Sequence, residues 1–78
     1  MNTRYAAFET ARLDLYENLE AAEHSVSLTA HIMEIDPSDR TITDYELALD
    51  RARAIRAEIG ANSNAEMHQR SIDAGLVT

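Results

Sequence analysis

Several residue types are missing or scarce in this 78-residue chain, and their absence excludes whole classes of chemistry. There is no cysteine, which excludes disulfide bonds, thiolate zinc sites and thiol catalysis. There is also no lysine, and seven arginines against fourteen Asp and Glu residues leave a net charge of −7. Because binding to nucleic-acid phosphates needs positive charge, we expect no nucleic-acid partner.

Long apolar runs are missing as well. No stretch approaches the roughly 20 apolar residues of a membrane span, and the first residues lack the apolar run of a secretory signal. We therefore expect a cytoplasmic protein with no membrane partner. The use of Arg without Lys, together with 13 alanines, fits a GC-rich genome, and a short chain of this kind would suit an accessory protein of an actinobacterium, a phage or another mobile element.

Proline and glycine are rare. The single proline, Pro37, and the two glycines, Gly60 and Gly75, divide the chain into three segments. No segment shows the alternation of a β-strand, and no internal repeat is visible. The sequence therefore predicts one all-α domain over residues 1–78. A long N-terminal helix packs antiparallel on a second helix, with a short C-terminal helix, as a helical hairpin or a three-helix bundle. The expected elements are a helix over about 3–35, a loop over 36–43, a helix over about 44–59 and a short helix over about 64–74.

The first segment carries a heptad pattern, which is typical of a helix that packs against other helices. Seven of the nine heptad positions are apolar, and Arg12 and Thr29 are the exceptions. Poor helix formers at 25–29 make a bend there one alternative. The positions are Tyr5, Phe8, Arg12, Leu15, Leu19, Ala22, Val26, Thr29 and Met33.

Punctuating residues set the expected ends of the two later helices. Thr43 and Glu46 match a capping box, and Gly60 is placed to end the second helix as a left-handed cap. Ser63 and Glu66 match a second capping box, which predicts the start of the third helix, and Gly75 its end. The apolar stripe of the second helix comprises Tyr45, Ala48, Ala52, Ile55 and Ile59.

The length of the first helix bears on assembly. At about 1.5 Å per residue it spans about 45–50 Å, whereas a compact globule of this chain length is about 30 Å across. We expect the second helix to cover only half of the first, which favours a homodimer of the four-helix-bundle type. A monomer with a bent first helix is the alternative. The predicted interface residues are Phe8, Arg12, Leu15, Leu19, Ala22, Val26, Met33, Tyr45, Ala48, Ala52, Ile55 and Ile59.

Support for catalysis or ligand chemistry is thin. There is no glycine-rich phosphate loop and no nucleophile in a recognisable setting, so we expect neither an enzyme nor a cofactor. Glu20, His24 and His31 share one side of the first helix, but a metal site needs about four ligands with supporting contacts. We interpret them as a solvated face and expect no metal.

Together these features indicate a non-enzymatic protein–protein interaction module, a small regulator or inhibitor that binds a larger protein. Two alternatives stay open. Residues 54–78 resemble a helix-turn-helix unit, with the turn at Gly60, which implies a DNA-associated regulator. The acidic face formed by Glu9, Glu17, Glu20 and Glu23 would suit a nucleic-acid mimic.

Overall fold

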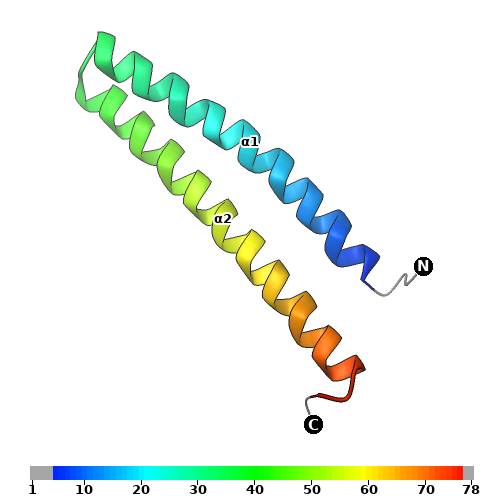
Figure 1. The fold of residues 1–78 in the computed structure, drawn as a ribbon. Helices are drawn as coiled ribbons and strands as arrows, with labels where there is room; N and C mark the ends of the chain where they lie inside the picture. The colour runs from blue at the N-terminus through cyan, green and yellow to red at the C-terminus, as the bar shows by residue number, and fades with distance from the viewer. Residues whose placement is uncertain (1–4, 77–78) are drawn as a thin grey trace.

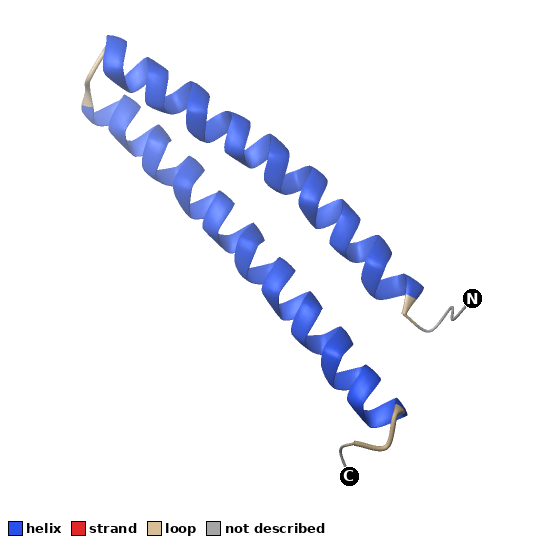
Figure 2. Cartoon of the chain, in the orientation of Figure 1, coloured by secondary structure: helices blue, strands red, loops and turns tan. Residues whose placement is uncertain are grey.

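A computed structural model describes residues 5–76 of the chain and shows two long antiparallel helices (Figures 1 and 2). Helix α1 spans Ala6–Ile35 and helix α2 spans Asp39–Asp73. The molecule measures 57 × 24 × 12 Å, and both termini lie at the same end of it. The all-α, antiparallel prediction is confirmed, while the predicted start near residue 3 lies outside the described residues.

The turn between the helices is shorter than predicted. Pro37 follows the end of α1, and Ser38 is the N-cap of α2. The Ser38 hydroxyl accepts from the backbone N–H of Thr41, and the Thr41 hydroxyl accepts from that of Ser38 at 2.9 Å. The predicted loop over 36–43 and the predicted cap at Thr43 are therefore wrong, because a complete capping box forms five residues earlier.

Helix α2 continues through Gly60, where the sequence predicted an end. Gly60 does not have the positive φ of a left-handed cap, and it lies exposed within the helix. Glycine inside a helix costs only about 1 kcal/mol relative to alanine, which packing of the flanking turns offsets. The break at 60–63 and the separate helix over 64–74 are therefore wrong.

Gly75 does end α2, as predicted. Its φ is +75°. Its N–H donates to the carbonyl of Ile72 at 3.0 Å, and the N–H of Leu76 donates to that of Ser71 at 2.9 Å. These two bonds form a Schellman motif, which satisfies the last carbonyls of the helix and favours glycine at this position.

The longer α2 changes the relation between the two helices. It runs beside α1 over its whole length (Figure 1), so the expectation that α1 outruns the rest of the chain is wrong. Helix α1 is unbroken through 25–29, where the Thr29 hydroxyl donates to the carbonyl of Ser25 at 2.7 Å. The result is an extended hairpin with a radius of gyration of 17.7 Å, against about 11–12 Å for a compact domain of this length.

Candidate functional site

The seam between the helices is where the sequence-predicted interface residues meet. All twelve of them are buried or half-buried, and they pack within one chain. Heptad spacing explains this arrangement, because residues three and four apart line one face of each helix. The central cluster consists of Leu15, Leu19, Ala22, Val26, Ala52, Ile55 and Ile59.

Small residues bring the two helices close together at the centre of this seam. Ala22 is fully buried and Ala52 is 1% exposed. No large side chain within residues 5–76 is fully buried. The apolar core of residues 5–76 is therefore a thin strip.

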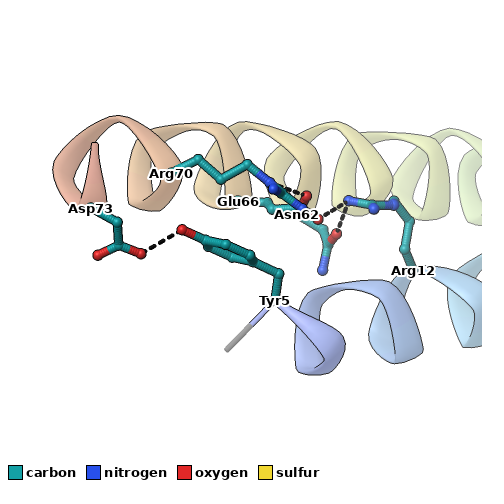
Figure 3. A network of polar contacts seen from close by, with 6 residues as sticks. All are labelled: Tyr5, Arg12, Asn62, Glu66, Arg70 and Asp73. Carbon is teal, nitrogen blue, oxygen red and sulfur yellow. Dashed lines mark hydrogen bonds and ion pairs between the residues drawn. The ribbon is translucent and has the colours of Figure 1, made fainter. Parts of the chain in front are cut away.

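Toward the termini the seam becomes polar. The Arg12 guanidinium donates from Nη1 to Oε1 of Glu66 at 2.8 Å and to Oδ1 of Asn62 at 3.1 Å (Figure 3). Arg70 donates from Nε to the other Glu66 oxygen at 2.8 Å. One carboxylate, on a side chain only 12% exposed, thus joins two arginines on different helices.

A tyrosine closes the open end of the hairpin. The Tyr5 hydroxyl donates to Oδ2 of Asp73 at 2.6 Å (Figure 3). The Arg70 guanidinium carbon lies 4.0 Å from the centre of the Tyr5 ring, which is within cation–π range. Gln69 donates to the second Asp73 oxygen at 3.0 Å. The N-terminal end of α1 is therefore tied to the last turns of α2.

The charge environment of Glu66 matches this geometry. Hydrogen bonds from Arg70 and Arg12, in that order, lower the pKa of Glu66 below its ordinary value of 4.5, against the opposing effect of burial. No buried side-chain nitrogen or oxygen within residues 5–76 lacks a hydrogen-bond partner. A saturated network of this kind fixes how two helices align.

The other candidate groups stay apart from the seam. Glu20, His24 and His31 are exposed on α1, and residues 5–76 contain no group of three His, Asp or Glu side chains able to hold a metal ion. Arg56 pairs with Glu23 of α1 at 2.9 Å, at an exposed position. An open hollow lined by Glu9, Arg12, Leu13 and Tyr16 lies on the surface of α1.

The resemblance to a helix-turn-helix unit does not hold in three dimensions. That unit needs a turn at Gly60, and α2 is continuous there. A helix-turn-helix unit would also place a buried apolar residue at the position of Glu66, where this chain has a carboxylate. Glu66 can be buried because its carboxylate accepts hydrogen bonds from Arg12 and Arg70.

Sequence reasoning missed the α2 half of the polar network. Asn62, Glu66 and Gln69 continue the four-three spacing of the apolar stripe beyond Ile59, and each is buried or half-buried. The heptad spacing, applied without regard to side-chain polarity, would have identified these three positions as part of the seam. Arg12 at a heptad position of α1 pointed to an acidic partner on the facing helix.

Comparisons with protein-family models, with curated proteins and with solved structures found no match to this chain. Neither described helix has the length combined with apolar character that crossing a bilayer requires. The functional proposal below therefore depends on the hairpin's own residues.

Proposed function

We propose that this chain is a non-enzymatic protein–protein interaction module, a small cytoplasmic regulator or inhibitor that binds a larger protein. The observation that carries the proposal is a second apolar line on α1, beside the seam, which α2 leaves uncovered. Leu28 is 52% exposed, Ile32 43% and Ile35 71%. Large apolar side chains gathered on one exposed helix face are typical of helix-docking surfaces.

This surface is different from the heptad stripe that first suggested association. The heptad stripe packs against α2, so it is occupied within the chain. The apolar line lies outside the hairpin, and its four-three spacing places the three side chains on one face of α1. A partner helix laid along this face would bury them without opening the seam.

Two matched substitutions test the proposal. Leu28→Glu places a charge in the apolar line, and Leu13→Glu makes the same change elsewhere on α1, at a leucine that is 65% exposed. We expect tagged wild-type protein and Leu13→Glu to retain the same partner from a lysate of the source organism, and Leu28→Glu to lose it. Quantitative mass spectrometry of the captured proteins provides the measurement, and equal capture by all three chains would contradict the proposal.

A further inference from the structure

The apolar line belongs to a longer uncharged stripe on α1, which we call the outer stripe. Its members follow the spacing four-three-four-three, the same rhythm as the seam, so they share one helix face. Two acids of this part of α1, Glu20 and Glu23, lie off this face. The outer stripe consists of Ala21, Ser25, Leu28, Ile32 and Ile35.

The hairpin leaves too much surface exposed for a chain of its size. Its accessible surface is 5809 Å², whereas a compact monomer of 8.7 kDa is expected to expose about 4,700 Å². The excess of about 1,100 Å² is comparable to the roughly 800 Å² that each partner buries in a standard-sized interface. A second chain packed on one face would bury an area of this order.

The outer stripe is complementary to itself when two copies run antiparallel. Leu28 lies at its centre, with large residues toward the tip of the hairpin and small ones toward the middle of α1. A two-fold axis at Leu28 sets Ile35 opposite Ala21 of the second copy, since each lies seven residues from the centre. Ile32 then lies opposite the turn of the second copy's α1 that contains Ser25. Large side chains opposite small ones are what close helix packing requires.

We propose that the occupant of the outer stripe is a second copy of this chain, with the two α1 helices antiparallel across Leu28 in a four-helix arrangement. The inference rests on the proposed association function and differs from it in one respect, since the partner at this face is a second copy of the chain and not a larger protein. Like charge of −7 on each copy opposes pairing, so salt strengthens the dimer by screening this repulsion.

Sedimentation equilibrium of the full chain at micromolar concentration tests the pairing. We expect the wild type and Leu13→Glu to have twice the chain mass of 8.7 kDa, about 17 kDa, and Leu28→Glu to have the mass of one chain. Circular dichroism of each sample at the same concentration reports whether it is folded. A folded wild-type monomer would overturn the inference, as would equal masses for the two glutamate variants.

A second measurement does not depend on a disruptive variant. Because the chain has no cysteine, Leu28→Cys places a single thiol at the proposed axis, and Glu20→Cys places one at an exposed position of α1 away from the stripe. We expect mild oxidation to link Leu28→Cys into a covalent dimer much faster than Glu20→Cys. Equal linking of both would overturn the proposed orientation.

These results separate the two proposals. A folded monomer that still captures another protein through Leu28 overturns self-pairing and supports the general interaction function. A dimer linked through Leu28→Cys that captures nothing supports self-pairing and contradicts binding to a larger protein.

Discussion

Arg12 and Glu66 stand 54 positions apart in the sequence, yet their side chains meet across the seam at 2.8 Å. Both occupy heptad positions where an apolar pair would otherwise pack. The open half of the hairpin is therefore aligned by a paired charge, whereas the tip-side half is held by apolar contact. Sliding α2 by one heptad would leave Glu66 without Arg12, so this contact selects one register.

A double-mutant cycle tests the role of this pair. Arg12→Leu and Glu66→Leu should each lower the thermal unfolding midpoint by several degrees, because each leaves a half-buried charge without its partner on the other helix. The double variant should recover most of the loss, since two leucines pack at facing seam positions. Circular dichroism melts provide the midpoints. Purely additive losses would show that the two side chains do not interact.

Acid should weaken the hairpin through Glu66. The pKa of Glu66 is lowered in the folded chain relative to its ordinary value of 4.5. This carboxylate therefore adds stability that is fully present above pH 4.5 and disappears as the pH falls through the folded-state pKa. The difference in unfolding free energy between the wild type and Glu66→Gln should shrink over that interval. A difference that stays constant from pH 6 to the acid limit would refute the assignment.

The two glycines should respond to alanine in opposite directions. Gly60 lies inside α2 with open space around the position of an added Cβ. Gly60→Ala should stabilise the hairpin by about 0.5–1 kcal/mol. Gly75→Ala should destabilise it by about 1 kcal/mol, because Gly75 has a φ of +75°. Urea unfolding measures the sign of the change in unfolding free energy for each variant. A loss of stability in Gly60→Ala would indicate that helix α2 is interrupted at that residue.

Ala22 should not tolerate a larger side chain. It is fully buried where the helices approach closely, so Ala22→Leu should cost about 1–3 kcal/mol through overpacking. Ala57→Leu makes the same change at an exposed position of α2 and should alter stability by less than about 0.5 kcal/mol. Similar effects of the two substitutions in urea unfolding would contradict the position of the seam.

Much of α1 was predictable because its pattern is carried by side-chain size and polarity. Seven apolar residues at heptad spacing, with Pro37 directly after the helix, are enough to place its buried face and its end. Arg12 keeps its heptad position in the seam, although its charge breaks the apolar pattern. Its partner was not predicted, because Glu66 was assigned to a separate third helix.

The continuity of α2 was harder to predict because local and distant effects oppose each other there. Gly60 and the Ser63–Glu66 capping pattern favour a break, and each signal concerns only a few neighbouring residues. Contacts with α1 favour a continuous helix instead. The main ones are the packing of Ile59 against the central cluster and the hydrogen bond from Arg12 to Glu66. Those contacts involve residues about fifty positions away, which no local pattern contains.

Isotope-filtered NOE spectroscopy on a mixture of ¹³C-labelled and unlabelled chains tests the outer stripe most directly. Our account predicts cross-peaks between copies from the methyl groups of Leu28, Ile32 and Ile35, including contacts from Ile35 to the methyl of Ala21, and none from Leu13. A spectrum of folded protein with no cross-peaks between copies, or with cross-peaks only at Leu13, would contradict it.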